Sequence, residues 1–255
     1  MGNRKLILIL ILAMNVSSIF GQYSYSIGYI KNEPIIAQTG TSTLFRVTDS
    51  LSLKAIDLDV KGEPEFINDC GIVMRPTLKK YDQLLILINN RPKLDLNFAH
   101  TVGSPFLTQE CGLLFASIDD SVFVFREGII VRKFMGSVVQ VDENYVYYYL
   151  PDIDAFVDVY KVDLKDFDKE ELVLPGPYSV YWVNLMPFKN GKYIACNIAS
   201  RDGGISSAIY NCETKEYKIL TEIDHNFVPV YFPKTETLHY LDPVKRTFTK
   251  EVSYR

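Results

Sequence analysis

Phe188 Lys189 Asn190 Gly191 Lys192 Tyr193 shows most clearly the pattern that decides the fold of this chain: an apolar stretch, a short polar turn and a second apolar stretch. The pattern occurs six times, and the second stretches are about 41 residues apart on average. They begin at Ile35, Ile72, Leu113, Tyr145, Tyr193 and Leu238. Strands that recur with this period are typical of a β-propeller. The sequence therefore predicts an all-β fold, a single β-propeller of six four-stranded blades, with five blades as the alternative.

The fifth repeat unit divides most clearly into four strands, which are expected near 184–188, 193–199, 207–212 and 217–221. One such sheet exposes apolar residues on both faces, so neighbouring blades must stack on it. The last unit is one strand short. Tyr23 to Ile27 is a candidate to complete it and close the ring, although the first blade needs the same residues. The charged segment Asp163 to Leu172 is expected to connect two strands rather than to form a helix.

Residues 1–21 have the features of a secretory signal peptide. Arg4 and Lys5 precede nine apolar residues, Leu6 to Met14, and small and polar residues follow as far as Gly21. A membrane-spanning helix would need about 20 apolar residues. We therefore expect cleavage after Gly21, a β-propeller domain over residues 22–255, and a secreted or periplasmic protein that does not span a membrane.

The charge balance argues against a nucleic-acid partner. Loss of the two basic residues of the leader leaves 25 Lys and Arg against 31 Asp and Glu, a net charge of −6. Binding to phosphates calls for a basic surface, which this composition does not supply.

The four cysteines are expected to have structural roles. Cys196 and Cys212 flank a predicted hairpin, which leaves two alternatives: a disulfide across the strands, or two buried free thiols. Cys70 and Cys111 each precede a glycine in a predicted turn. A metal or redox pair usually brings its cysteines close in sequence, so tight turns with half-buried thiols are the favoured interpretation of these two.

Candidate binding residues gather on one face of the predicted propeller. The turns between the first and second strands of each blade lie on one face, whereas the second-to-third turns and the crossovers between blades share the other. Two of the residues predicted on that second face, Asp119 and Asp120, lie in a second-to-third turn. The binding candidates there are His100, Asp152, Asp154, Tyr178, Trp182, Arg201, Asp202 and His225. Aromatic rings offer contact area to a peptide or sugar, although Trp182 is also suited to the core of a strand.

The fifth unit also resembles a known repeat. Asn190 to Ala195, Ser200 to Gly204, Ile209 Tyr210 and Ile219 to Thr221 resemble the WD40-like repeat of TolB-type β-propellers. That repeat reads Ser Pro Asp Gly Lys, an apolar strand, Ser Arg Asp Gly, a short strand ending in Tyr, and a closing Leu Thr. This chain contains no full Ser Pro Asp Gly. The resemblance implies a propeller with a periplasmic or extracellular protein-binding role.

Motifs for common catalytic chemistry are absent from the sequence. It has no G-x-S-x-G, no G-x-x-x-x-G-K, no H-E-x-x-H and no calcium-binding loop. We therefore predict no catalytic residue, no metal site and no cofactor. The favoured function is a non-catalytic binding or scaffold module for a protein, peptide or glycan. The alternative is a carbohydrate-active enzyme in which two of Asp152, Asp154 and Asp202 act as general acid and base.

Overall fold

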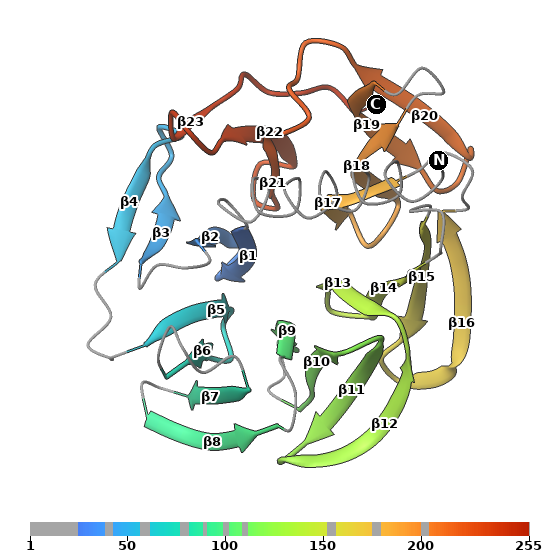
Figure 1. Ribbon diagram of the computed structural model, residues 1–255. Helices are drawn as coiled ribbons and strands as arrows, with labels where there is room; N and C mark the ends of the chain where they lie inside the picture. The colour runs from blue at the N-terminus through green and yellow to red at the C-terminus, as the bar shows by residue number, and fades with distance from the viewer. Residues whose placement is uncertain are drawn as a thin grey trace, which may run out of the picture.

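The computed structural model of the protein describes residues 25–38, 43–56, 62–76, 82–88, 91–98, 102–108, 112–151, 157–174, 180–199 and 204–254. Within these ranges the chain forms strands and turns but no helix. The described residues accordingly contain no helical segment with the length and apolar character needed to cross a membrane. The strands build six antiparallel sheets, which are arranged as blades around a common centre (Figure 1). The predicted six-bladed β-propeller is confirmed.

Blades 1 to 3 each contain four strands, paired in chain order. The strands of blade 1 are β1 (Tyr25–Ile30), β2 (Glu33–Gln38), β3 (Leu44–Val47) and β4 (Leu53–Ile56). Those of blade 2 are β5 (Glu63–Ile67), β6 (Ile72–Arg75), β7 (Gln83–Ile88) and β8 (Arg91–Asn97). Those of blade 3 are β9 (Val102–Leu107), β10 (Leu114–Ile118), β11 (Ser121–Arg126) and β12 (Ile129–Met135).

Blades 4 and 5 also contain four strands, whereas blade 6 has three among the residues described. The strands of blade 4 are β13 (Ser137–Val141), β14 (Tyr145–Pro151), β15 (Val157–Asp163) and β16 (Asp166–Leu174). Those of blade 5 are β17 (Val180–Phe188), β18 (Tyr193–Ala199), β19 (Ile205–Asn211) and β20 (Glu216–Leu220). Those of blade 6 are β21 (Val228–Phe232), β22 (Thr237–Asp242) and β23 (Thr247–Phe248).

Each blade runs from the centre of the ring to its perimeter. The first strands β1, β5, β9, β13, β17 and β21 lie near the centre, and the fourth strands β4, β8, β12, β16 and β20 lie at the perimeter (Figure 1). This order sorts the connections into two faces. We call the face with the first-to-second and third-to-fourth turns the turn face. The face with the second-to-third turns and the crossovers between blades is the mouth face.

Two of the polar turns of the sequence pattern contain paired residues in the left-handed conformation. Lys31 and Asn32 join β1 to β2 with φ angles of 51° and 62°, and Lys189 and Asn190 join β17 to β18 with 52° and 54°. Paired left-handed residues match the right-handed twist of the strands they connect. This local chemistry explains why the hairpins can be predicted from sequence. The charged segment forms a turn at Leu164 and Lys165 and then the strand β16, so the prediction that Asp163 to Leu172 only connects two strands is wrong for most of its length. The charged residues fit a strand here because β16 is an outer strand with exposed side chains.

The hydrophobic core lies between the blades. Phe66 of blade 2 contacts Phe106 of blade 3, with ring centroids 5.3 Å apart. Phe134 of blade 3 likewise lies 4.8 Å from Tyr148 of blade 4. Burying one such side chain stabilises the fold by about 1.5–3 kcal/mol. Stacking of neighbouring sheets is therefore the main source of stability. This agrees with the prediction that a single four-stranded blade cannot bury both of its apolar faces.

Blades 1 and 2 approach so closely that one position requires glycine. A methyl group added to Gly28 in β1 would lie 1.5 Å from the carbonyl oxygen of Ile67 in β5. No side chain fits at that distance, so the absence of a Cβ atom at Gly28 allows the two inner strands to pack together.

The ring closes through side-chain contacts between blades 6 and 1. The N-terminal strand β1 pairs with β2 in blade 1, so it does not complete the three-stranded sheet of blade 6. Tyr29 donates a hydrogen bond from Oη to the Tyr231 carbonyl at 3.2 Å, and Tyr25 does so to the Pro243 carbonyl at 3.3 Å. Residues of blades 1, 5 and 6 also share one apolar cluster.

Candidate functional site on the mouth face

Most of the predicted binding residues lie outside the described residues. These are His100, Asp152, Asp154, Tyr178, Arg201 and Asp202. The backbone of Trp182 lies in β17, and its side chain is not described. His225 is described, and it lies in the crossover between blades 5 and 6, on the mouth face as predicted. Asp119 and Asp120 form the exposed turn between β10 and β11 on the same face.

A buried cluster of charged residues lies at the mouth end of blade 2. Glu63 and Glu65 are in β5 and Arg75 is the last residue of β6, with exposures of 3%, 7% and 6%. Arg75 donates a hydrogen bond from Nε to Oε1 of Glu65 at 2.6 Å, and Glu63 lies opposite Arg75 in the strand pairing. The two inner strands of blade 2 thus carry two carboxyl groups and one guanidinium group in a small volume.

Local backbone features bring Glu65 to Arg75. The pairing of β5 and β6 shifts register between Pro64 and Phe66, which places Glu65 at a β-bulge. A bulge redirects side chains, and a proline at this point removes one backbone donor from the strand. Ser26 of β1 donates a hydrogen bond from Oγ to the Glu65 carbonyl, so blade 1 also holds this segment in place.

Sequence reasoning missed this cluster. Its signal is a Glu-x-Glu pair, Glu63 and Glu65, in a first strand, followed ten residues after Glu65 by Arg75 at the end of the second strand. Glu65 lies two residues before the end of its strand, where the first strands of blades 4, 5 and 6 have the apolar residues Val139, Met186 and Val230. A charged pair at inner-strand positions is a better indicator of a site than an aspartate in a loop, because loops use aspartate to form turns.

Buried polar side chains also position the crossover that carries His225. Asn197 of β18 is 3% exposed and donates a hydrogen bond from Nδ2 to the His225 carbonyl at 2.7 Å. Ser207 of β19 is fully buried and donates from Oγ to the Asp224 carbonyl at 3.3 Å. The His225 imidazole, about one-third exposed, has Nδ1 at 3.7 Å from Oδ1 of Asp224. The crossover therefore presents a histidine on a fixed backbone.

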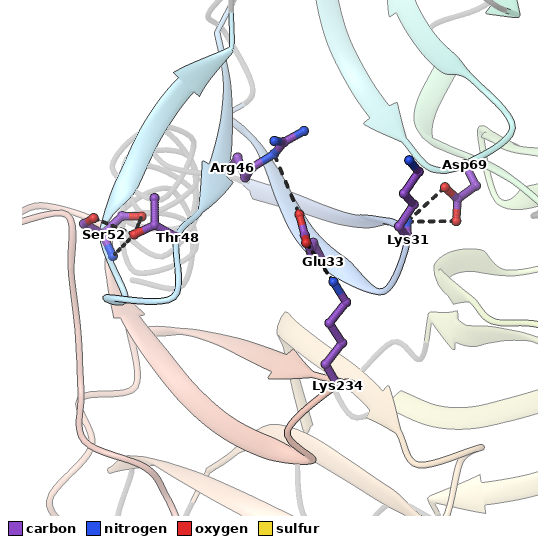
Figure 2. Close-up of polar contacts among 7 residues, drawn as sticks. All are labelled: Lys31, Glu33, Arg46, Thr48, Ser52, Asp69 and Lys234. Carbon is purple, nitrogen blue, oxygen red and sulfur yellow. Dashed lines mark hydrogen bonds and ion pairs between the residues drawn. The ribbon is translucent and has the colours of Figure 1, made fainter.

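Polar residues on the turn face join one blade to the next (Figure 2). The backbone N–H of Lys31 in blade 1 donates to both carboxylate oxygens of Asp69 in blade 2, at 2.9 and 3.0 Å. On the other side of blade 1, Lys234 of blade 6 contacts Glu33 at 2.7 Å, and Arg46 lies 3.9 Å from the same carboxylate. The hydrogen bond and the charge of Lys234 lower the pKa of Glu33.

The same kind of contact continues around the turn face. Asn68 of blade 2 donates a hydrogen bond from Nδ2 to the Leu107 carbonyl of blade 3 at 2.6 Å. Lys189 of blade 5 forms an ion pair of 2.5 Å with Glu236 of blade 6. These groups bond to one another across the seams between blades, which gives the turn face a structural role.

The cysteines differ from the sequence predictions. Cys70 is buried and disulfide-bonded, so the half-buried thiol predicted there is wrong, and Cys70 is also excluded as a thiolate ligand. Cys196 and Cys212 are free, so the disulfide considered between them is wrong. The alternative of two buried free thiols is correct for Cys196, whereas Cys212 is half-buried. The reason is register: Cys196 pairs with Ala208, four residues before Cys212. Burial raises the pKa of Cys196 to about 12 and that of Cys212 to about 11, so both remain protonated at neutral pH.

In the part of the chain that the structure describes, no three or more His, Cys, Asp or Glu side chains are grouped so that they could hold a metal ion.

Comparison with known proteins supports the fold. No protein-family model matches the sequence, and no curated protein matches it. Among solved structures, Hsv2 of Kluyveromyces lactis matches with a TM-score of 0.56 and 13% identity over 86% of this chain and 70% of that chain. A hydrazine synthase of Kuenenia stuttgartiensis matches at 0.55 and 11% over 84% and 72%. A TolB-type protein of Agrobacterium tumefaciens matches at 0.53 and 8% over 77% and 80%. At these identities the likeness concerns the β-propeller fold alone, and that fold is what this chain has in common with all three.

Proposed function

We propose that this chain is an exported, non-catalytic binding module that holds a protein or peptide partner on its mouth face. The observation that carries the proposal is the buried cluster of Glu63, Glu65 and Arg75 at the mouth end of blade 2. The fold is compatible with this function, because propellers present their loops and inner strand ends on a rigid scaffold.

The energetics of the cluster favour a role in recognition over one in stability. Removing two charges from water costs several kcal/mol per ion, and their attraction often does little more than offset that cost. An apolar pair of similar volume would stabilise blade 2 at least as well. The pair instead holds the mouth ends of β5 and β6 in one relative position, which suits a rigid scaffold that presents this end of blade 2 to a partner.

Two features support export. The first 21 residues have the pattern of a cleaved leader, which predicts a mature protein that begins at Gln22. Cys70 is disulfide-bonded, and disulfides persist mainly in oxidising compartments. The intact mass of the protein purified from its native source tests this point. A mass that includes residues 1–21 would contradict export by leader cleavage.

A pair of matched double variants tests the binding face. Glu65→Leu with Arg75→Met removes the buried charges of the mouth, and Glu33→Ala with Lys234→Ala removes an exposed charge pair of the turn face. Each variant, together with the unchanged protein, is expressed in the native organism and cross-linked, and its partners are identified by mass spectrometry. Thermal unfolding confirms that all three are folded.

We expect the mouth variant to lose its main cross-linked partner and the turn-face variant to keep it. Equal retention by both variants would contradict the proposal. A glycan array and a polysaccharide hydrolysis panel cover the remaining classes of ligand. Hydrolysis that is abolished by Asp152→Asn or Asp202→Asn would replace the binding function with that of a carbohydrate-active enzyme.

A further inference from the structure

Blade 6 has fewer strands than the other blades among the described residues, and the segment that follows it extends toward blade 5. Its third strand, β23, has two residues, and its sheet has no fourth strand in the described ranges. Residues 249–254 come next, and this red segment runs from β23 toward blade 5 (Figure 1). We call these residues the terminal segment.

The terminal segment continues the contact with β22 beyond the end of β23. The backbone N–H of Thr249 donates a hydrogen bond to the Tyr240 carbonyl at 2.9 Å, and that of Val252 donates to the Leu238 carbonyl at 2.8 Å. Thr249 Oγ1 accepts a hydrogen bond from the Tyr240 N–H at 3.0 Å. Because Leu238 is next to the turn between β21 and β22, the terminal segment follows β22 as far as the turn face.

Tyr254 then inserts between blades 5 and 6. The centroid of its ring lies 5.1 Å from that of Phe188 and 5.2 Å from that of Tyr193, and both of these residues belong to blade 5. Its hydroxyl group donates a hydrogen bond to the Glu236 carbonyl of blade 6 at 2.6 Å. Tyr254 is only 7% exposed. One buried side chain of the terminal segment therefore contacts both blades.

Two lysines of blade 5 contact the terminal segment from the outside. Lys189, which pairs with Glu236, has Nζ 5.6 Å from the centre of the Tyr254 ring. Lys218 of the outer strand β20 donates a hydrogen bond from Nζ to the Ser253 carbonyl at 2.7 Å. Polar contacts at exposed sites contribute little to stability, whereas burial of an aromatic ring contributes much more. The position of the terminal segment therefore depends mainly on Tyr254.

The residues around Tyr254 also connect to the other seam of blade 6. Phe188 contacts Tyr231 of blade 6, with ring centroids 5.1 Å apart. The Tyr231 carbonyl accepts the hydrogen bond from Tyr29 of blade 1. A continuous series of contacts therefore runs from the terminal segment through blades 5 and 6 to blade 1.

We propose that the terminal segment is a latch, which fixes blade 6 to blade 5 through Tyr254 and opens while the sheets remain folded. Val252 and Tyr254 are buried, but Lys250, Glu251 and Ser253 are exposed. Segments with few buried contacts open more easily than the whole protein unfolds. Opening uncovers the aromatic rings that surround Tyr254 on the turn face. The latch lies away from the mouth face, so it does not depend on the proposed binding function.

Hydrogen exchange of single amides, followed by NMR on the full mature chain at several low urea concentrations, tests whether the latch opens locally. We expect the Val252 amide to exchange at least about tenfold faster than the slowest amides of β21 and β22. Its rate should hardly change with urea, because local opening exposes little surface. A Val252 rate that equals theirs and rises as steeply with urea would overturn the proposal.

Variants of Tyr254 test what holds the latch. Tyr254→Ala should speed exchange at Val252 at least about tenfold, because the buried ring is lost. Exchange should also become faster in 186–193 of blade 5 and in β21, and stay constant in blade 2. Tyr254→Phe keeps the ring contacts and loses the hydrogen bond to the Glu236 carbonyl, so its effect should be smaller.

Phe248→Ala is the matched control. Phe248 precedes the terminal segment, and its ring contacts Phe232 of its own blade at 6.1 Å. We expect this variant to change exchange in blade 6 and to leave 186–193 of blade 5 unchanged. Unchanged exchange at Val252 in Tyr254→Ala would overturn the proposal, as would an equal increase in all blades. If Tyr254→Ala does not fold, a Tyr254→Phe variant in which Val252 exchanges only with global unfolding would overturn it as well.

The effect on blade 5 separates a latch from a simple extension of blade 6. A Phe248→Ala variant that speeds exchange in 186–193 as much as Tyr254→Ala does would show that blade 5 responds to any loss of packing in blade 6. That result would also overturn the proposal, because the contact between the blades would then not depend on Tyr254.

Discussion

On the turn face of the propeller, Lys234 and Glu33 are exposed and join two blades, whereas on the mouth face Arg75 and Glu65 are buried within one blade. Both pairs have short contacts, of 2.7 and 2.6 Å. Their surroundings differ: water screens the first pair, and protein encloses the second. The contact distance alone therefore does not indicate how much an ion pair matters to the stability of the fold. Burial decides how much stability is lost when one partner is removed, and the following variants test this order.

The largest effect is expected inside the mouth end of blade 2. Arg75→Met leaves the Glu65 carboxylate buried without its partner, which should lower the free energy of unfolding by about 3–5 kcal/mol. Urea denaturation measures the change. Adding Glu65→Leu to the same protein should recover most of the loss, because no unpaired charge remains. A single variant as stable as the unchanged protein would mean that the cluster is not closed to water.

The disulfide of Cys70 should give the next largest effect. Cys196 and Cys212 are free, so Cys111, which lies outside the described residues, is the one cysteine left to bond it. Non-reducing peptide mapping should therefore find Cys70 linked to Cys111. Cys70→Ser should reduce stability by about 2–4 kcal/mol, because it removes a cross-link that limits the unfolded chain. Cys212→Ser is the control, and an equal loss in that variant would argue against the assignment.

A smaller effect is expected at the crossover that carries His225. Asn197→Ala removes the buried donor to the His225 carbonyl and should cost about 1–3 kcal/mol. The loss should be local. Hydrogen exchange measured by mass spectrometry should speed up in 221–227 and stay constant in blade 2. Equally faster hydrogen exchange in all blades would instead mean that Asn197 contributes to the global stability of the fold.

The smallest effect is expected for the exposed pair of the turn face, and it should depend on pH. The pKa of Glu33 is lower in the folded protein because Lys234 donates a hydrogen bond to it, so the pair stabilises the fold above the ordinary pKa of Glu. The contribution is lost as the pH falls through the folded-state value. The small difference in melting temperature between Lys234→Ala and the unchanged protein should therefore vanish in acid and in high salt. A difference that persists at low pH would contradict this account.

The sequence predicts the blades well because their determinants are local. The turn Lys189 Asn190 Gly191 and the strand that begins at Tyr193 are set by residues next to one another. Among the described residues the last unit has three strands, as predicted from the number of apolar runs in its sequence. Within one blade, the period of the apolar residues and the residue types of the turns are enough to predict the strands and hairpins.

Features that depend on register or on contacts between distant residues could not be predicted in this way. The pairing of Cys196 with Ala208 is set by the whole β18–β19 ladder, and an error of a few residues changes which side chains meet. The bulge that turns Glu65 toward Arg75 is marked in the sequence only by Pro64, and a proline is also found at the start of a strand or on an edge strand, so it does not locate a bulge by itself. The place of β1 in blade 1 follows from its pairing with β2, and the close approach of Gly28 to Ile67 of blade 2 is likewise visible only in the packed structure.

Within the described part of the chain, blades 6 and 1 share no strand, and this has a mechanical consequence. Opening the seam between blades 6 and 1 breaks side-chain contacts such as that of Tyr29 with the Tyr231 carbonyl, and it leaves every backbone ladder intact. Stretching the molecule by its two ends should therefore first give an open arc of six folded sheets. The sheets should unfold only after the contacts between blades 6 and 1 have broken.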